Sequence, residues 1–435
     1  MATAGLKACA TEPNGGTAER GMGIIRIIHS SDTREVDALL SPRRTDDRAV
    51  MRRVRRIVDA VRAEGDGAVR RYAAQFDGFD GPFEIPRAAW KADARRAPRD
   101  VRAALKFAAA NIARVAQAQR PVSRRVRVAP GVTVEQRVRP LDRVGCYVPG
   151  GRYPLPSTLL MTAIPARVAG VPEIIAACPR PDPIVLAAAE AAGVTRLFRL
   201  GGAHAIAALA FGTSSIPPVD RIVGPGNKYV AAAKNYVSSE VGIDMQAGPS
   251  EILILSDSGD PAWLAADLIA QAEHDPDARA LLITTKRRLA AAVASEADRR
   301  VPDEGPARAA LAANGGIIVA RTRAEMIALA NRMAPEHLVV DDEATAAAVS
   351  RAGAIFIGAH TAQVAGDYAI GSNHVLPTGG AARFRGGLST ADFVRVVSVQ
   401  RLTPAGLRRL APIVRTLARA EGLVSHEASI RVRVP

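Results

Sequence analysis

The sequence predicts an α/β protein: two Rossmann-like units, each a parallel sheet with helices on its faces, and a small helical C-terminal tail. Three observations lead to this prediction. From Pro149 onward, short apolar runs alternate with helical patterns; the alternation restarts after Gly248; and the chain is mostly helical from Thr403. Such alternation of strands and helices indicates a parallel sheet. A chain of 435 residues, 48% of them hydrophobic, can bury more than one core of this kind.

The region before Pro149 has a different pattern. Residues 47–76 form an Arg-rich helical pattern, residues 98–118 form another, and "GVTVEQRVRPLDRVGCYV" alternates like strands. We expect residues 23–145 to pack with the second α/β unit. Residues 1–22 contain no apolar segment of the kind that a secretory signal needs, and we expect them to form a disordered leader.

The first predicted Rossmann-like unit covers residues 146–249. Its predicted strands are "EIIAAC", "TRLFRLGG" and "RIVGPG", and its helices are "PIVLAAAEAAGV", "AHAIAALAFG" and "NKYVAAAKNYVSSEV". Three glycine clusters, "VPGGRYPLP", "LGGAHAIAALAFGT" and "VGPGNKYV", follow strands or precede helices. Each cluster alone is typical of an ordinary turn. Together they indicate a ligand crevice at the carboxyl edge of the sheet.

The second predicted unit covers residues 250–388 and should carry the metal and catalytic loops. Its strands are "EILILSD", "RALLITT", "GGIIVAR" and "GAIFIG", and its helices are 261–273, 286–299 and 322–333. Residues 389–435 then form the predicted helical tail, with "TPAGLRRLAPIVRTLARAEGL" as its main pattern.

Composition argues against several classes of protein. The net charge of +15 comes from arginines scattered along the chain, and aromatic residues are only 4%, too few for base-stacking platforms, so we expect no nucleic-acid partner. No apolar run reaches the roughly 18 residues that span a bilayer, so we expect no membrane segment. The three cysteines form no Cys-x-x-Cys pair, which favours a reducing compartment and a cytoplasmic protein.

One polar motif lies where an amphipathic helix should end. In "DLIAQAEHDPDA", Gln271 and His274 are three residues apart and would share one helix face. Alone, this is typical of a surface helix terminus. Asp367 lies in a Gly-rich segment, "AGDYAIGSNHVLPTGG", and His426 lies near the C-terminus. If the four side chains converged, they would form a nitrogen and oxygen site without sulfur, suited to zinc, manganese or cobalt.

A second polar motif, "APEHLVV", places Glu336 beside His337. Pro335 should end the preceding helix, so we expect the two residues in a loop. Alone, the motif is a common polar helix exit. A carboxylate and an imidazole in one cleft can also act as two bases, one for a proton and one for a water molecule. The start of another motif, His426–Glu427, fails as a zinc-protease signature because Ile430 stands where the second histidine belongs.

From about Ile24 to the C-terminus, the chain resembles the bacterial histidinol dehydrogenase family. The resemblance is carried by long motifs: "VPGGRYPLPSTLLMTAIPARVAGV", "GGAHAIAALAFGT", "VDRIVGPGNKYV", "IDMQAGPSE", "QAEHDPDA", "APEHL" and "GDYAIGSNHVLPT". It implies a homodimer of two Rossmann-like units with small C-terminal elements. It also implies oxidation of L-histidinol to L-histidine with two NAD and one zinc ion per subunit, the last steps of histidine biosynthesis.

The resemblance also implies roles for individual residues. The implied catalytic pair is Glu336 and His337, with His337 as the base for the hydroxyl proton and Glu336 activating water. The implied zinc ligands are Gln271, His274, Asp367 and His426. The implied cofactor-binding residues are Tyr147, His204 and Asn227. The implied substrate-binding residues are Ser250 and Glu421, together with His337 and the four zinc ligands.

One departure from the family pattern leaves an alternative open. The family usually has Gln where this chain has His204 in "GGAHAIAAL", which puts the contact to NAD there in question. The alternative is a related zinc and NAD dehydrogenase that acts on another small polar alcohol. Glu421 and His426 favour histidinol, because a new substrate should first alter the residues that contact it. The resemblance further implies that the tail completes the partner subunit's site.

Overall fold

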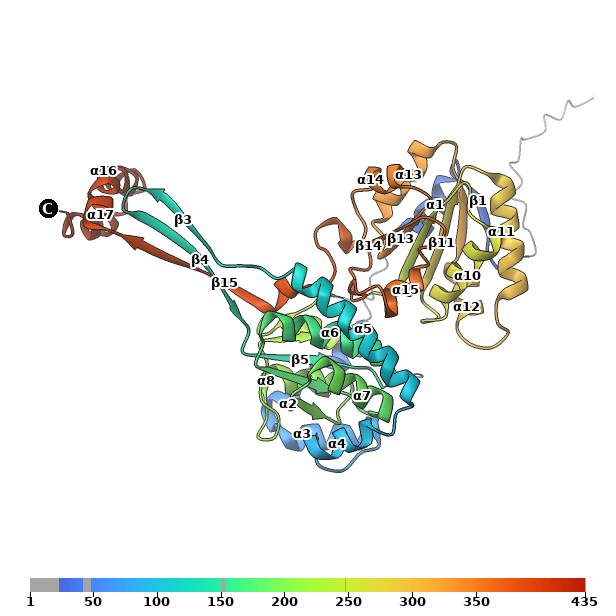
Figure 1. The fold of residues 1–435 in the computed structure, drawn as a ribbon, viewed down its shortest axis with the longest axis horizontal. Coiled ribbons are helices and arrows are strands. Elements are labelled where there is room, and N and C mark those ends of the chain that lie inside the picture. Colours follow the sequence, from blue (N-terminus) through green and yellow to red (C-terminus); the bar gives the residue numbers. More distant parts are fainter. Residues whose placement is uncertain (1–22, 42–47, 151–153, 247, 435) are drawn as a thin grey trace, which may run out of the picture. The chain divides into compact units, whose positions relative to one another are not determined.

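The computed structural model describes residues 23–41, 48–150, 154–246 and 248–434. It is an α/β chain that divides into two compact units (Figure 1). The β10 unit, named after its central strand, comprises residues up to 42 and 249–361, and the β5 unit comprises residues 43–248 and 362–435. The predicted leader, residues 1–22, lies outside the described residues. No helix in the described ranges is both long and apolar enough to cross a membrane.

The sheet of the β10 unit has six parallel strands. Their order is β1 (Ile27–His29), β12 (Gly316–Val319), β11 (Arg279–Thr284), β10 (Glu251–Leu255), β13 (His337–Val340) and β14 (Ala354–Ile357). Apart from β1, the order is that of the Rossmann fold, in which the third, second and first strands precede the fourth and fifth. The strand order therefore reverses between β10 and β13.

Helices cover both faces of this sheet. Ile252 and Ile254 of β10 pack against α10 (Pro261–Ala272), α11 (Arg287–Arg300) and α12 (Ala307–Asn314). The alternate residues Leu253 and Leu255 pack against α1 (Thr33–Leu40), α13 (Arg323–Met333) and α14 (Glu343–Ala348). A strand buried on both faces reads as a continuous apolar run, which is what "EILIL" is.

The sheet of the β5 unit repeats this order. Its strands are β2 (Glu84–Ile85), β7 (Arg196–Phe198), β6 (Glu173–Ala177), β5 (Arg143–Tyr147), β8 (Arg221–Val223) and β9 (Gly242–Ile243). The pairs from β7 to β9 are parallel, and β2 is an antiparallel edge strand. The order reverses between β5 and β8. The α/β class and the two Rossmann-like sheets that the sequence predicts are confirmed.

The helices of the β5 unit also form two layers. One face is covered by α4 (Arg87–Ala94), α5 (Arg99–Ala118), α6 (Pro156–Ala169) and α7 (Pro183–Ala192). The other is covered by α2 (Arg48–Glu64), α3 (Asp66–Tyr72), α8 (Gly202–Phe211) and α9 (Lys228–Val237). Between α3 and β2 lies a short π-helix, η1 (Ala73–Asp77). The single predicted helix over 47–76 is thus broken, at Gly65 with φ of 57°.

The predicted packing of residues 23–145 is mostly wrong. Only β1 and α1 join the β10 unit, where β1 pairs with β12. Helix α2 packs on α8 and α9, and α5 packs on α6. The reason is the apolar stripe of each helix: the α2 valines and Ile57 join the core of the β5 unit. An amphipathic pattern shows which face of a helix is buried and does not show against which sheet.

The segment after β14 also differs from the prediction. Residues 362–388 were expected in the second α/β unit, but they belong to the β5 unit, where they form α15 (Gln363–Tyr368) and η2 (Ala381–Arg383); η3 (Thr390–Phe393) follows them. The reason is that Val375 and Leu388 lie in the core of that unit. The Asn373 side chain also donates to the Met161 carbonyl over 2.7 Å.

The predicted helical tail begins with a strand. β15 (Val394–Leu402) pairs antiparallel with β4 (Val132–Pro140) along its full length, and β4 pairs with β3 (Arg124–Ala129). Helices α16 (Pro404–Ala420) and α17 (Val424–Arg431) follow, and Figure 1 shows them at the end of this sheet. We call β3, β4, β15, α16 and α17 the arm. The strand forms because "VRVVSVQRL" is rich in β-branched valines and finds a partner distant in sequence.

Candidate active site

The two predicted catalytic residues lie at the amino end of β13. Glu336 immediately precedes the strand and His337 is its first residue, so the expectation that both lie in a loop is right only for Glu336. Helix α13 ends just before them, at Met333, and Ala334 takes a left-handed conformation with φ of 52°. That conformation is unfavourable for a residue with a Cβ atom. The turn at Ala334 limits the connection between α13 and β13 to three residues, and Glu336 is the last of them, directly before the strand.

The position of His337 fixes which of its nitrogens can act as a base. Its side chain is buried, and Nδ1 lies 3.0 Å from the backbone carbonyl oxygen of Glu251. A carbonyl oxygen only accepts hydrogen bonds, so Nδ1 carries the proton in the neutral ring. Nε2 then carries the lone pair. A neutral imidazole oriented in this way is suited to accept a proton.

Glu336 is held by the same residue. Its side chain is buried, and Oε2 accepts a hydrogen bond from the Glu251 backbone N–H over 2.8 Å. The same oxygen lies 3.7 Å from Nδ1 of His337. The carboxylate and the imidazole are therefore adjacent in space as well as in sequence. Ser250, a predicted substrate residue, directly precedes Glu251, and its carbonyl accepts the Arg279 N–H over 2.9 Å.

Two predicted metal ligands lie at this same amino edge of the sheet. Helix α10 connects the carboxyl end of β10 to the amino end of β11, so Gln271 in its last turn returns to the amino edge. His274 lies just past the helix end and not on it. Its Nδ1 is 3.2 Å from the carbonyl oxygens of Ala270 and Gln271. Nδ1 is therefore the protonated nitrogen, and Nε2 is the one able to bind a metal.

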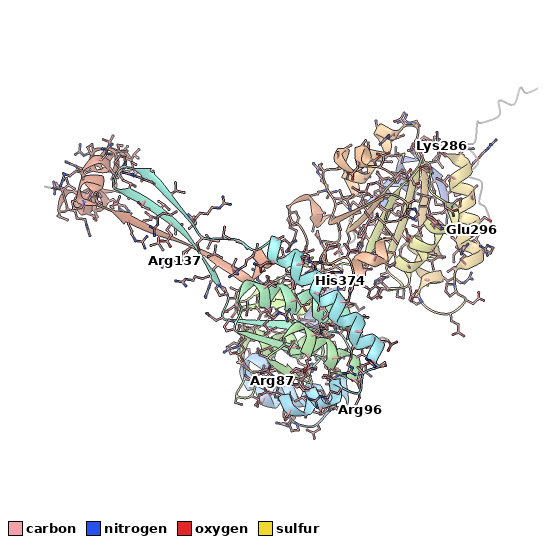
Figure 2. The ribbon with its side chains drawn as sticks, viewed as in Figure 1. Arg87, Arg96, Arg137, Lys286, Glu296 and His374 are labelled. Carbon is pink, nitrogen blue, oxygen red and sulfur yellow. The ribbon has the colours of Figure 1, made fainter. Side chains whose placement is uncertain are left out.

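The other two predicted ligands belong to the β5 unit. Asp367 lies in helix α15 and not in a loop, and its Oδ2 accepts from the Gln363 side chain over 2.9 Å. His374, labelled in Figure 2, follows α15 and donates from Nδ1 to the Asp367 carbonyl over 3.0 Å. His426 is exposed on α17. Within the described residues, no group of three or more His, Cys, Asp or Glu side chains forms a metal site.

The predicted ligands nevertheless suit a zinc ion chemically. The Gln271 side chain is fully buried, and neither of its amide atoms has a hydrogen-bond partner among the residues described. A buried amide in this state is costly unless something binds it. Two imidazoles, a carboxylate and an amide oxygen form a donor set of the kind that zinc accepts in an open site.

The predicted cofactor residues Tyr147 and Asn227 lie at the carboxyl edge of the β5 sheet. Tyr147 is the last residue of β5, and Asn227 follows β8. The strand order reverses between these two strands, which is where Rossmann folds bind ligands. Burial raises the pKa of the Tyr147 hydroxyl above its usual range, and its oxygen accepts the Gly202 N–H over 3.0 Å. Asn227 is the N-cap of α9, where its side-chain oxygen accepts from Tyr229 and Val230.

The glycine-rich turn at this edge is braced by a buried ion pair that the sequence reasoning missed. Gly224 has φ of 117°, and a Cβ atom there would lie 2.2 Å from the Tyr147 carbonyl oxygen. The Gly224 N–H donates to Asp244 over 2.7 Å, and its carbonyl accepts from Lys234 over 2.9 Å. Lys234 and Asp244 also pair with each other, both buried. The available signal was a lysine on the apolar stripe of α9, beside Val230 and Val237.

His204 is fully buried in α8, so its side chain would have to move before it could contact a ligand directly. Its Nε2 lies 3.1 Å from Oδ2 of Asp77, and this oxygen also accepts the Gly201 N–H over 3.0 Å. Asp77 ends the π-helix η1, and nothing in its sequence context pointed to this role. The Asp77 carboxylate thus binds the N-terminal turn of α8 where Gly201 offers no side chain to do so.

The predicted substrate residue Glu421 lies at the other end of the β5 unit, on the arm. It is the C-cap of α16 and, like His426, is exposed. Around them, large apolar side chains are also exposed: Ile413, Leu417, Val424 and Val432. An apolar surface of this kind on a small helical element is typical of a protein–protein contact.

The chain is similar to proteins of one family along nearly its whole length. A family model described as histidinol dehydrogenase matches residues 40–434. The histidinol dehydrogenase of Rhizobium meliloti is 45% identical over 424 residues, 94% of this chain and 98% of the relative. That of Methylococcus capsulatus is 44% identical over 415 residues, 92% of this chain and 95% of the relative. The crystal structure of histidinol dehydrogenase from Elizabethkingia anophelis matches with a TM-score of 0.90 and 32% identity, covering 95% of this chain and 99% of that one.

Proposed function

The chain belongs to the histidinol dehydrogenase family, and on this premise we propose that it oxidises L-histidinol to L-histidine through L-histidinal. This is the last part of histidine biosynthesis, with NAD as the hydride acceptor. The observation that carries the proposal is the buried pair of Glu336 and His337, both oriented by the backbone of Glu251. Oxidation of an alcohol and then of an aldehyde needs one base for a hydroxyl proton and one for a water molecule.

The alcohol step is assigned to His337. Its Nδ1 donates to the Glu251 carbonyl, so Nε2 takes the hydroxyl proton as the hydride leaves the carbon. The aldehyde must then add water before a second hydride can leave. Glu336 takes a proton from that water, since its carboxylate is kept next to the imidazole by the Glu251 N–H. Each step thus releases one hydride and one proton, and the second also consumes a water molecule.

The cofactor is assigned to the carboxyl edge of the β5 sheet. When bound there, NAD accepts the hydride in each step. Tyr147 and Asn227 line the edge, and Gly224 leaves room for close approach of a ligand to the backbone. His204 supports the site indirectly, through the Asp77 carboxylate that holds the first turn of α8.

One zinc ion per subunit is assigned to Gln271, His274, Asp367 and His426. These residues would hold the ion, which would supply Lewis-acid chemistry to the bound substrate. The buried Gln271 amide and the Nδ1-protonated His274 are the features that support this assignment. Ser250 and Glu421 are assigned to the substrate, together with His337 and the zinc ligands.

The proposed assembly is a homodimer in which the arm completes the partner subunit's site. The exposed apolar side chains around Glu421 and His426 support a contact of this kind. We also propose a cytoplasmic location, as expected for an enzyme of amino-acid biosynthesis. The Cys146 and Cys178 thiols are buried, and burial raises the pKa of both to about 12, which makes them unreactive.

The activity is tested by NADH formation with L-histidinol and, separately, with other small amino alcohols. We expect about two NADH for each histidinol consumed, because the acid is reached by two hydride transfers. A ratio of one, with free aldehyde as product, would favour the alternative of a related dehydrogenase for another small polar alcohol. A clear preference for a different amino alcohol would favour it as well.

The shared site is tested by mixing two inactive variants. His337→Asn and His426→Ala are unfolded together and refolded. If the arm serves the partner, one site of each mixed dimer inherits both lesions and the other inherits neither. Random pairing makes half of the dimers mixed, so roughly a quarter of the wild-type activity should return. No recovery, with mixed dimers verified by mass, would place all the zinc ligands of a site on one chain.

A further inference from the structure

We propose that Arg279 and Glu251 are positioning residues for the catalytic pair. In this proposal, their buried ion pair fixes the start of β10 so that the main chain of Glu251 holds His337 in one tautomer and Glu336 beside it. The inference rests on the proposed function, because it takes Glu336 and His337 as the bases of the reaction. Neither Arg279 nor Glu251 is needed to contact the substrate.

The two main-chain groups of Glu251 bind the two bases. Its N–H donates to Oε2 of Glu336 over 2.8 Å, and its carbonyl accepts from Nδ1 of His337 over 3.0 Å. In the parallel register of β10 with β13, Ile252 is the partner of His337, so Glu251 lies level with Glu336. A small shift of Glu251 would therefore disturb both bases at once.

Arg279 fixes the same segment from the opposite side. It is the first residue of β11 and the register partner of Glu251 in the parallel pair β10–β11. The backbone N–H of Arg279 donates to the Ser250 carbonyl over 2.9 Å, and the side-chain Nη1 donates to Oε1 of Glu251 over 3.0 Å. Nη1 also lies 3.3 Å from the Ser41 carbonyl. Residues 250 and 251 are thus bound to β11 on one side and to the catalytic pair on the other.

The burial of this ion pair is the reason to assign it a role beyond folding. The side chains of Arg279 and Glu251 are each only 2% exposed. Taking two charges out of water is expensive, and two apolar side chains of similar size often fill such a space at lower cost. Apolar side chains make no directional contacts. The hydrogen bonds of a charged pair are directional, and they can therefore fix the position of the backbone that carries the pair.

The chemical consequence concerns the imidazole. While Nδ1 donates to the Glu251 carbonyl, the lone pair of neutral His337 stays on Nε2. If the carbonyl moves away, the other tautomer becomes accessible, with its lone pair on Nδ1, beside Glu336 and away from an incoming hydroxyl. Loss of Arg279 should therefore lower the rate of the chemical steps far more than it weakens substrate binding.

The first measurement is steady-state kinetics on the zinc-loaded enzyme. We expect Arg279→Met to lower kcat by about 10- to 100-fold, the usual effect of losing a group that orients a functional side chain, with little change in the KM for histidinol. Arg279→Lys, which keeps a cation for Glu251, should recover part of kcat. Val293→Ala is the control, because it removes a fully buried group from α11 of the same unit and removes none of the ion pair's hydrogen bonds. It should lower the melting temperature and leave kcat unchanged.

The second measurement reads the tautomer directly and is independent of turnover. The protein is labelled with [15N]histidine, and long-range proton–nitrogen correlations are recorded at about pH 8.5, above the usual titration range of imidazole. His337→Asn identifies the His337 signals among the seven histidines of the chain. We expect the wild type to show a proton on Nδ1, and Arg279→Met to show a mixture of tautomers or the Nε2-protonated ring.

The outcomes separate the two proposals. If folded Arg279→Met keeps both its kcat and the Nδ1–H tautomer, the ion pair has only a structural role and the inference is wrong. If Arg279→Met does not fold, Arg279→Lys and Glu251→Gln are judged by the same two measurements. If His337→Asn retains turnover, the assignment of the base fails, and the tautomer data still decide whether Arg279 positions the imidazole.

Discussion

The sheet around β5 and the sheet around β10 have the same strand order, and their assigned functional residues lie at opposite edges. In the β5 unit they lie at the carboxyl edge, where a Rossmann fold binds its ligand: Tyr147 is the last residue of β5, and Asn227 follows β8. In the β10 unit they lie at the amino edge: Glu336 just before β13, His337 as its first residue, and Gln271 in the last turn of α10.

The carboxyl edge of the β10 sheet differs because its own side chains fill it. Asp257, just after β10, accepts from the Thr284 hydroxyl over 2.8 Å and the Thr285 hydroxyl over 2.7 Å. Asp341, just after β13, accepts the Asp257 N–H over 2.9 Å and the Ser258 hydroxyl over 3.0 Å. At the corresponding place in the β5 unit are Gly224 and an exposed Asn227. In the proposed assignment, one fold thus carries the cofactor residues at this edge in one copy, and a hydrogen-bonded carboxylate network occupies the same edge in the other.

The largest expected effect is that of removing the metal from the amino edge of the β10 unit. We expect chelation to abolish turnover and to leave the fold largely intact, because the apolar cores of both α/β units contain none of the proposed ligands. Activity and circular dichroism of the chelated protein check this, with zinc added back as the control. Full activity without metal would exclude the zinc assignment, and unfolding would make the site structural.

The next effect separates the two bases of that edge. We expect His337→Asn to lower the rates with both histidinol and histidinal by about 10²- to 10⁴-fold, the usual contribution of a general base. Glu336→Gln should impair the aldehyde step more than the alcohol step, because it removes the base for water. Rates with alcohol and aldehyde supplied separately provide the measurement. If Glu336→Gln lowered the rates with histidinol and histidinal equally, the two bases would not have the separate roles proposed here.

A smaller effect is expected at the carboxyl edge of the β5 unit, on NAD alone. Gly224→Ala places a Cβ against the Tyr147 carbonyl and should raise the KM for NAD about tenfold or more, with a lesser effect on the KM for histidinol. Gly65→Ala is the matched control. It also has positive φ, 57°, but an added Cβ meets no atom within 4 Å. In both variants a side chain is forced into a sparsely populated backbone region, which costs about 1–3 kcal/mol. A difference in NAD kinetics between the two variants therefore reports the effect of the Gly224 turn and not backbone strain in general.

The smallest effect on function is expected at Asp257, at the carboxyl edge of the β10 sheet. Burial opposes ionisation of Asp257, but hydrogen bonds from Thr285 and Thr284 outweigh it and hold its pKa below the usual range. A depressed pKa stabilises the fold above the unfolded carboxyl's pKa, near 3.9, and this contribution is lost as the pH falls.

Asp257→Asn should therefore destabilise the protein by about 1–2 kcal/mol at neutral pH, through weakened hydrogen bonds, with a shrinking difference below about pH 4. The KM for NAD should not change. Denaturant unfolding at several pH values and NAD kinetics check the two parts. A large rise in the KM for NAD would mean that the closed edge also takes part in cofactor binding, and the contrast between the two sheets would disappear.

The sequence by itself determined the elements whose signals are local. Apolar runs such as "EILIL" predicted buried strands, and the pattern around Val185 and Leu186 predicted α7, because the period of apolar residues follows directly from helix and strand geometry. The motifs likewise led to the family, and each named site residue could be located from its own neighbours. The adjacency of Glu336 and His337 required no folding to be seen.

The tertiary structure alone decided which distant segments meet. It paired β15 with β4, joined α2 to the β5 unit, and brought Asp77 to His204 and Arg279 to Glu251. It also decided that Nδ1 of His337 carries the proton, since the accepting carbonyl lies 86 residues away in the chain. The physical reason is that hydrogen bonds and ion pairs depend on distances in space. A periodic pattern fixes which face of an element is buried, but not which partner buries it.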